Sequence, residues 1–326
     1  MSKIKNKFKE SFFIVNKIYL FIAFILLSIQ SFGLGIIYFL ATFFMFIWKT
    51  LSSKLPMEID ENIDFETVSY KTIEDRNLKI DIYYPKGRSD SNYPLVYFCH
   101  GGGWISGFRN QPNNISWCKY LASKGFVASS IDYRYGYKNT IEDLLGDYTD
   151  GLEFLKENAS KFQIDKENIS LMGLSAGAHL SLLYSTFNSH VDKKDKMEGV
   201  KSVVAYYPPS DLKDLFTEDS KSIFTRFAAA STMKGTPTSE EEIYKKYSPI
   251  NWLSKNMVPT LVAHGKADKI VPFESSVKLV KKLNQLKIKN KFLIHNNGPH
   301  SFDTKLNDYR TVDTVEKTVR FIKDSF

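Results

Sequence analysis

A short stretch in the middle of the chain, residues 169–180, constrains the fold more than any other part of the sequence. It reads ISLMGLSAGAHL, an apolar run followed by Gly-Leu-Ser-Ala-Gly and then by residues compatible with a helix. This is the order required of a G-x-S-x-G strand–turn–helix, in which the serine, here Ser175, stands on a sharp turn with its hydroxyl exposed. A side chain at Gly173 or Gly177 would clash with the backbone that passes close to such a turn. An ordinary glycine–serine turn has the same letters, so further signals are needed.

Three consecutive glycines follow an apolar run at residues 95–99. They belong to the sequence His-Gly-Gly-Gly-Trp at residues 100–104. Because glycine has no side chain, such a loop can bring its backbone close to a substrate and present N–H groups to an oxyanion. His100 is expected to brace this loop rather than to act as a base. A flexible glycine turn is the alternative, and the position of the loop, one strand–helix–strand–helix before residues 169–180, argues against it.

An acid and a histidine follow later in the chain, each after an apolar run. Asp268 lies in AHGKADKIVP at residues 263–272, and His300 lies in GPHSF at residues 298–302. Taken singly, Asp268 could cap a turn and His300 could be a surface histidine. Together with Ser175 they stand in the order serine, aspartate, histidine, which is typical of one large class of serine hydrolases. The spacings of 93 and 32 residues leave room for one strand and one helix between the acid and the histidine.

The chain from residue 65 onward alternates short apolar runs with amphipathic segments. The expected strands are 78–84, 95–99, 127–132, 169–172, 203–206, 260–264 and 292–295. The expected helices are 115–124, 140–161, 176–186, 273–286 and 310–323. Short apolar strands that alternate with helices form βαβ units, so the sequence predicts an α/β fold with a parallel sheet buried on both faces.

Six motifs together resemble those of the α/β-hydrolase carboxylesterases, in particular the hormone-sensitive-lipase-like and bacterial feruloyl- and acetyl-esterase-like branch. The motifs are HGGGW at 100–104, DYRY at 132–135, GLSAG at 173–177, YYPPSDL at 206–212, HGKADKIVP at 264–272 and GPHSF at 298–302. The resemblance covers residues 65–326 and implies the α/β-hydrolase fold, a mostly parallel central sheet with helices on both faces. It is highly specific for the fold and much less specific for the substrate.

The resemblance also implies chemical roles for individual residues. It makes Ser175 the nucleophile, His300 the general base and Asp268 the acid that orients His300. The oxyanion hole would be formed by the backbone N–H groups of Gly102, Gly103 and Ala176. The expected reaction is acyl transfer in two steps through an acyl-enzyme on Ser175, and it requires no metal ion or organic cofactor.

Aromatic and charged residues near these motifs have two interpretations each. Four aromatic side chains could line the substrate pocket or pack in the core: Trp104, Tyr133, Tyr206 and Tyr207. Asp132 and Arg134 are expected to form an ion pair that braces the loop after the third strand rather than to act in catalysis. Residues 209–255 carry phenylalanine, methionine and tryptophan among polar residues, a composition that favours a partial lid over the site.

The first 54 residues differ in composition from the rest of the chain. Residues 18–48 are 31 positions without a charge, in which Leu, Ile and Phe dominate. A bilayer is crossed by about 20 apolar residues, and a cleaved signal peptide would have a shorter apolar region and a small-residue cleavage site. We therefore expect a basic tail at 1–11, a transmembrane segment at 12–48, a linker at 49–64 and a catalytic domain at 65–326.

The transmembrane segment could be one long helix or a two-helix hairpin that turns near residues 30–33. By the positive-inside rule, a hairpin would place both lysine-bearing flanks and the catalytic domain in the cytoplasm, whereas a single span would place the domain outside. The hairpin is preferred, and both arrangements stay open. The chain is thus expected to be an integral membrane protein whose catalytic domain faces the cytoplasm.

The net charge and the cysteines exclude several other functions. The formal net charge is +8, but residues 1–54 hold seven lysines and one glutamate, whereas residues 55–326 hold 37 basic and 35 acidic residues. The charge therefore does not indicate a nucleic-acid groove. Two cysteines, Cys99 and Cys118, are too few for a disulfide framework or a cysteine zinc site, and Cys99 ends an apolar run and is expected to be a buried thiol.

The sequence thus predicts a membrane-anchored serine carboxylesterase that acts on small-molecule esters with small to medium acyl chains. An arylformamidase-like amidase or a peptidase on the same fold is the enzymatic alternative. A non-catalytic, membrane-bound binding module is a further alternative, although all the expected catalytic positions are occupied by residues able to act.

Overall fold

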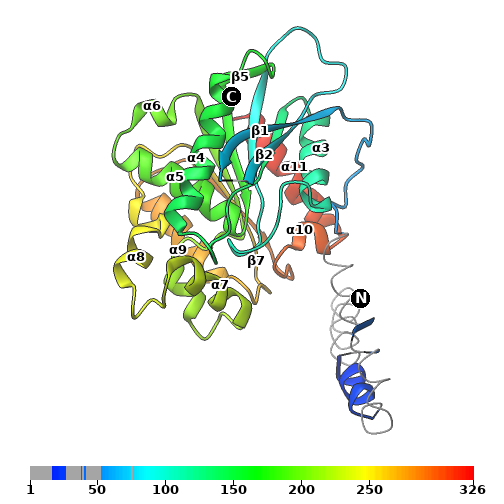
Figure 1. The fold of residues 1–326 in the computed structure, drawn as a ribbon, viewed down its shortest axis with the longest axis vertical. Coiled ribbons are helices and arrows are strands. Elements are labelled where there is room, and N and C mark those ends of the chain that lie inside the picture. The colour runs from blue at the N-terminus through cyan, green and yellow to red at the C-terminus, as the bar shows by residue number, and fades with distance from the viewer. Residues whose placement is uncertain (1–16, 27–37, 39, 42–52, 75) are drawn as a thin grey trace. The chain divides into compact units, whose positions relative to one another are not determined.

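Residues 17–26, 38, 40–41, 53–74 and 76–326 are described by the computed structural model of the chain (Figure 1). The chain divides into two units, Met1–Ser53 and Lys54–Phe326. In the first unit residues 17–26 are helical and expose apolar side chains such as Phe21 and Leu26. Across the described residues, no helix combines the length and the apolar character needed to cross a membrane. The predicted tail at 1–11 and most of the predicted segment at 12–48 lie outside the described residues.

Eight strands form one sheet in the second unit, in the order β1-β2-β4-β3-β5-β6-β7-β8. The strands are β1 Phe65–Ile73, β2 Arg76–Tyr83, β3 Tyr93–Cys99, β4 Val127–Ile131, β5 Ile164–Leu174, β6 Val200–Tyr206, β7 Thr260–Gly265 and β8 Asn290–His295. The pairs β1–β2 and β2–β4 are antiparallel. The other five pairs, β4–β3, β3–β5, β5–β6, β6–β7 and β7–β8, are parallel. The mostly parallel sheet that the sequence predicts is thus confirmed.

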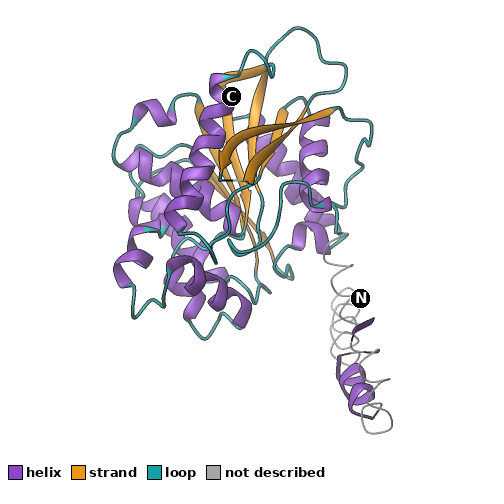
Figure 2. Cartoon of the chain, in the orientation of Figure 1, coloured by secondary structure: helices purple, strands orange, loops and turns teal. Residues whose placement is uncertain are grey.

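Helices cover both faces of this sheet (Figure 2). They are α3 Pro112–Ser123, α4 Ile141–Glu157, α5 Ala176–His190, α6 Lys194–Met197, α7 Ile223–Met233, α8 Glu241–Lys246, α9 Phe273–Gln285, α10 Phe302–Lys305 and α11 Tyr309–Lys323, with the 3-10 helices η1 Leu212–Phe216 and η2 Pro249–Trp252. One core cluster contains residues of α4, α5 and α9, and the other contains residues of α3 and α11. The two groups of helices therefore lie on opposite faces, as Figure 1 shows.

The central strands are apolar because helices cover them on both sides. Every residue of β4 and β7 is buried, and so are the last five residues of β3. On one face Trp117 of α3 and Ile322 of α11 pack against the sheet. The two cysteines, Cys99 at the end of β3 and Cys118 in α3, are free and buried, which confirms the buried thiol expected at Cys99.

The first strand, β1, is absent from the sequence-based prediction. Its sequence is FETVSYKTI, and all of its side chains are exposed or half-buried. It lies at the edge of the sheet and pairs only with β2, with a register shift between Ser69 and Lys71. An edge strand needs no continuous apolar run, so its sequence lacks the signal that identifies the buried strands.

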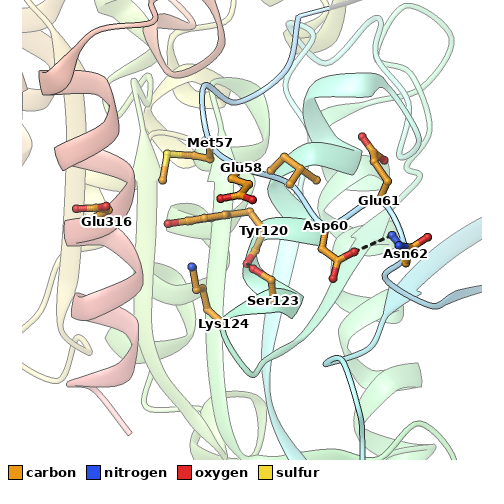
Figure 3. Close-up of a pocket in the computed structure, with 10 residues that line it drawn as sticks. Met57, Glu58, Asp60, Glu61, Asn62, Tyr120, Ser123, Lys124 and Glu316 are labelled. Carbon is orange, nitrogen blue, oxygen red and sulfur yellow. Dashed lines mark hydrogen bonds between the residues drawn. The ribbon is translucent and has the colours of Figure 1, made fainter.

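Most of the predicted linker, residues 54–64, belongs to the second unit and packs onto the rest of it. Leu55 and Ile63 are buried, and Lys119 of α3 contacts the carboxylate of Glu61 at 2.7 Å. An open hollow of about 680 Å³ lies between this segment, the C-terminal end of α3 and the middle of α11 (Figure 3). Its lining is Met57, Glu58, Ile59, Asp60, Glu61, Asn62, Tyr120, Ser123, Lys124 and Glu316.

The prediction of an ion pair between Asp132 and Arg134 is wrong, because each residue has another partner. Asp132 instead accepts from Arg109 Nη1 at 2.8 Å, and the same guanidinium reaches Asp81 through Nε at 2.8 Å. Arg134 pairs with the buried Asp147 of α4, with Nε 2.7 Å from Oδ2. Asp132 and Arg134 are close in sequence, but each turns to a different neighbouring element.

Two histidines are buried in the neutral form. Nε2 of His179 in α5 donates to the carbonyl of Tyr247 at 2.8 Å, so its Nδ1 accepts from Trp104 Nε1 at 3.3 Å. Burial lowers the pKa of His179 to about 4, and the hydrogen bond to Tyr247 opposes this only in part. Burial also lowers the pKa of His100 to about 4, against opposing contributions from the Gly101 carbonyl and Asp132.

We expect Arg109→Ala to lower the free energy of unfolding by about 3 kcal/mol, because it leaves two carboxylates without their partner inside the protein. Asp81 and Asp132 are the two carboxylates, and Asp81 is buried. The matched control is Lys213→Ala, which removes an exposed pair with Glu241 and should cost less than about 1 kcal/mol. Chemical denaturation of both variants measures the difference, and equal losses would contradict the prediction.

The two buried histidines should make the protein less stable as the pH falls from 6.5 to 4. In this range the unfolded chain binds a proton at each histidine and the folded chain does not, so stability is complete above pH 6.5 and is lost on acidification. Each site contributes roughly 3 kcal/mol over the whole range. The variant His179→Gln should therefore show a smaller dependence of unfolding free energy on pH than the wild type. An unchanged slope would show that His179 is not neutral in the fold.

Candidate active site

The turn between β5 and α5 places Ser175 in a strained backbone conformation. Ser175 has φ 52° and ψ −115°, a conformation that residues with a side chain rarely adopt. Its backbone N–H donates to the carbonyl of Tyr206 at 2.9 Å, which ties the turn to the neighbouring strand β6. A Cβ atom at Gly173 would overlap the backbone of Gly177, and one at Gly177 would overlap the carbonyl of Cys99. Glycine is therefore required at both positions.

The structure brings together the three residues that the sequence places far apart. His300 Nε2 lies 3.1 Å from Ser175 Oγ, and His300 Nδ1 lies 2.7 Å from Asp268 Oδ2. Ser175 follows β5, Asp268 follows β7 and His300 follows β8, so all three lie at the carboxyl ends of parallel strands. Because Nδ1 faces a carboxylate it carries the hydrogen, which leaves Nε2 free to accept from the serine hydroxyl.

Asp268 is held in one orientation by its surroundings. Its Oδ1 accepts from the backbone N–H groups of Ile270 at 2.8 Å and Val271 at 3.0 Å. Burial raises the pKa of the carboxyl, but the charge of His300 and the hydrogen bonds from His264 and His300 outweigh it, so this pKa lies well below its usual range. Asp268 therefore stays ionised at neutral pH.

His264, at the end of β7, is a site residue to which sequence reasoning assigned no role. Its Nε2 lies 3.1 Å from Asp268 Oδ2 and 3.2 Å from the carbonyl of Val271. Both partners are acceptors, so Nε2 carries a hydrogen and Nδ1 accepts from Ser276 Oγ at 2.7 Å. Two histidines thus share one carboxylate oxygen. The sequence offered a signal for this role, because His264 is the first residue of the motif that contains Asp268.

The glycine loop lies directly against the serine turn. A Cβ atom on Gly101 would lie 3.1 Å from the carbonyl oxygen of Leu174 and 3.3 Å from Ser175 Cβ. Within the described part of the chain, the backbone N–H groups of Gly102 and Gly103 donate no hydrogen bond. Ala176 is the first residue of α5, where a helix leaves its N–H without an intrahelical partner. The three expected donors therefore lie on the two segments that meet at Ser175, the glycine loop and the first turn of α5.

His100 braces the glycine loop, as the sequence suggests. Its Nδ1 donates to the carbonyl of Gly101 at 2.6 Å, and its ring stacks on Tyr133 with 4.3 Å between the ring centroids. The hydroxyl of Tyr133 in turn donates to the carbonyl of His100 at 3.0 Å. The low pKa of His100 keeps this ring uncharged beside the loop.

The four aromatic residues expected near a pocket are all buried, and the polar atom of each contacts a partner within the fold. Trp104 donates to His179, and Tyr206 shares a hydrogen bond with Thr318 Oγ1 at 2.8 Å. Tyr133 donates to the His100 carbonyl. Tyr207 donates to Asp303, and its ring lies against His300 with 4.5 Å between the centroids. A pocket role stays a prediction for each, and the structure adds a packing role to all four.

Asp303 of α10 is a second buried carboxyl close to His300, and the sequence analysis did not identify it. Its two oxygens accept from Trp117 Nε1 and from the hydroxyl of Tyr207, each at 2.8 Å. Burial raises the pKa of this carboxyl, and the two hydrogen bonds oppose the rise. The contact fixes the ring of Tyr207, whose backbone φ is 40°, against His300.

Helix α7 lies in the segment 209–255 that the sequence suggests as a partial lid. A Cβ atom on Gly103 would lie 3.1 Å from both Phe224 Cε1 and Ala228 Cβ, so α7 packs directly on the glycine loop. Lys234, which ends α7 in a left-handed conformation, donates from Nζ to the carbonyl of Gly136 at 2.8 Å. Among the described residues, no group of three or more His, Cys, Asp or Glu side chains is arranged to hold a metal ion.

Comparison with curated proteins relates the chain to esterases. Esterase LipC of Mycobacterium tuberculosis is 28% identical over 249 residues, which are 74% of this chain and 61% of LipC. A probable isoprenylcysteine alpha-carbonyl methylesterase, ICME of Oryza sativa subsp. japonica, is 29% identical over 238 residues, which are 68% of this chain and 55% of that protein. The chain therefore spans less than two thirds of the length of either relative.

Comparison with solved structures supports the fold. A truncated form of a carbohydrate esterase from gut microbiota has a TM-score of 0.69 and 23% identity, and the match covers 82% of this chain and 99% of that one. The model that describes the BD-FAE family matches residues 80–283, which is more than half of the chain. The resemblance inferred from the six sequence motifs is thereby confirmed. The chain belongs to the BD-FAE family and has the α/β-hydrolase fold.

Proposed function

We propose that the chain is a serine carboxylesterase that hydrolyses small-molecule esters of small to medium acyl chains through an acyl-enzyme on Ser175. The observation that carries this proposal is the hydrogen-bonded row from Ser175 Oγ through His300 to Asp268, beside two glycines with unpaired N–H groups. Two relatives are named as an esterase and a probable methylesterase, which agrees with this proposal.

In the proposed first step, Ser175 Oγ attacks the ester carbonyl carbon while its proton moves to His300 Nε2. The carbonyl oxygen gains negative charge, and the N–H groups of Gly102, Gly103 and Ala176 are the donors proposed to stabilise it. The tetrahedral intermediate then expels the alcohol, whose oxygen receives from His300 the proton that came from Ser175. The products of this step are the free alcohol and an acyl group bonded to Ser175.

The second step repeats the same proton transfers with water as the nucleophile. His300 Nε2 accepts a proton from water as the water oxygen attacks the acyl carbon, and it then returns the proton to Ser175 Oγ as the acid leaves. Asp268, ionised and held by four donors, keeps the hydrogen of His300 on Nδ1 and stabilises the transient positive charge of the ring. His264 acts through Asp268 as a positioning residue.

We also propose that residues 12–48 attach the catalytic domain, residues 65–326, to a lipid bilayer. The support is the run of 31 uncharged positions at residues 18–48, together with the apolar side chains exposed in the helix at residues 17–26. A hairpin, with the domain on the cytoplasmic side, satisfies the lysine distribution on both flanks. Segment 209–255 is proposed to be a partial lid.

Ser175→Ala should reduce kcat on 4-nitrophenyl butyrate to background, a loss on the order of 10⁶-fold, because no other group replaces the nucleophile. Asp268→Asn should cost on the order of 10⁴-fold, since it misaligns and destabilises the protonated His300. The control is Ser91→Ala, an exposed serine in the loop before β3, which should keep wild-type rates. Cleavage of aryl formamides that requires Ser175, without any ester hydrolysis, would replace the esterase proposal by the amidase alternative.

Membrane attachment predicts that the full chain stays in the membrane pellet after an alkaline carbonate wash, because apolar insertion resists the removal of electrostatic contacts. Replacing four residues of the uncharged run, Ile22, Ile25, Leu26 and Leu40, by lysine should release the protein to the supernatant. Quantitative immunoblotting of both fractions measures the partition. Release of the wild-type chain by carbonate alone would contradict membrane insertion.

A further inference from the structure

Helix α7 leaves three of its four large apolar side chains exposed, which is unusual for a helix whose only role is packing. Its buried positions are Thr225, Ala228, Ala229, Thr232 and Met233, which are mostly small or polar. Its exposed positions include Ile223 at 84%, Phe224 at 50% and Phe227 at 61% of full exposure. An amphipathic helix on a protein surface normally has the reverse distribution. A cluster of exposed apolar residues on one helix indicates a binding role.

One of the exposed side chains of α7, Phe224, reaches the glycine loop of the candidate active site. Phe224 lies so close to Gly103 that a Cβ atom there would contact the ring at 3.1 Å. Gly103 is one of the proposed donors to the ester carbonyl oxygen. We therefore expect an ester bound with its carbonyl at this N–H to lie close to Phe224, which is 50% exposed. Phe227, one helical turn further along α7, extends the same apolar face.

The position of α7 is fixed, and its apolar face carries no charge. The one charged residue of the helix, Arg226, turns back and donates from Nη2 to the carbonyls of Thr217 and Ser220, each at 2.9 Å. The side chain of Ser222 caps the first turn by accepting from the N–H of Thr225 at 3.2 Å. At the other end, Thr232 lies where any side chain on Gly136 would be, so the helix and that loop are in close contact.

We propose that Ile223, Phe224 and Phe227 bind the apolar chain of the ester that reacts at Ser175, and so select esters with an extended apolar chain over acetates. This inference rests on the proposed esterase function and adds the substrate class to it. The proposed ligand of this face of α7 is the hydrocarbon chain of the one ester molecule that reacts at Ser175. Apolar contacts of this size in a binding site discriminate substrates by roughly 10- to 200-fold per well-placed group.

The test compares kcat/KM of the full chain on short and long esters. One series varies the acyl side, 4-nitrophenyl octanoate against 4-nitrophenyl acetate, and the other varies the alcohol side, octyl acetate against ethyl acetate. In Phe224→Ser and Phe227→Ser combined, the long-to-short ratio should fall about tenfold or more in at least one series. Phe224→Leu should restore most of the ratio, because it keeps an apolar group. The matched control is Phe65→Ser, a phenylalanine with 55% exposure on β1, which should keep the wild-type ratios.

Unchanged ratios in both series, in a variant with wild-type thermal unfolding, would overturn this inference and leave the proposed function intact. An equal loss on short and long esters would also overturn it, since α7 would then act on the chemical step rather than on selection. Unchanged ratios together with weaker binding to phosphatidylcholine vesicles would instead assign the face to a lipid surface. Absence of ester hydrolysis by the wild type would overturn both proposals.

Discussion

The contact between the first turn of α5 and the end of β3 is the constraint on which the site depends. At Gly177 there is no room for a Cβ atom beside the carbonyl of Cys99, and at Gly173 there is none beside Gly177. Backbone therefore meets backbone at this point, and the strained turn at Ser175 is held by packing on both sides. The glycine loop that begins after Cys99 is brought to the same place. One steric condition thus sets the position of the serine hydroxyl and of the unpaired N–H groups.

Hydrogen bonding then fixes the chemical state of each ring near the site. His300, His264 and His179 each face an acceptor with one nitrogen, so the position of the hydrogen on each ring follows from its surroundings. At His300 the remaining nitrogen faces the serine hydroxyl, whereas at His264 and His179 it accepts from Ser276 and Trp104. Similar rings therefore have different roles, because their second partner differs.

Much of the fold and the central site could be predicted from the sequence. The turn at Ser175, the glycine loop and the order of the acid and the histidine depend on local motifs, and the buried strands depend on apolar runs. The edge strand β1 has no such run, and the partners of Arg109 and Arg134 depend on packing between elements distant in sequence. The same reason explains why Asp303 was missed.

Residues singled out in the sequence can have a further role that only the fold reveals. Trp104 was identified from its motif, but its contact with His179 joins the glycine loop to α5. Phe224 belongs to the segment 209–255, whose composition suggests a lid, and only its approach to Gly103 connects it with the site. Contacts between distant elements, which no motif encodes, therefore decide which aromatic residues are buried and which stay exposed to solvent.

The order of the strands also bears on how copies of this chain would meet. β1 and β8 are the outer strands of the sheet, and an outer strand offers unpaired backbone groups to which another chain could add. β8 begins within the lysine-rich sequence KIKNK at residues 287–291, so two copies brought together along this edge would repel each other. β1 is interrupted by the register shift at Ser69 and Lys71, which breaks the regular row of groups needed for continued pairing. Both edges are therefore protected against extension of the sheet from one molecule into the next.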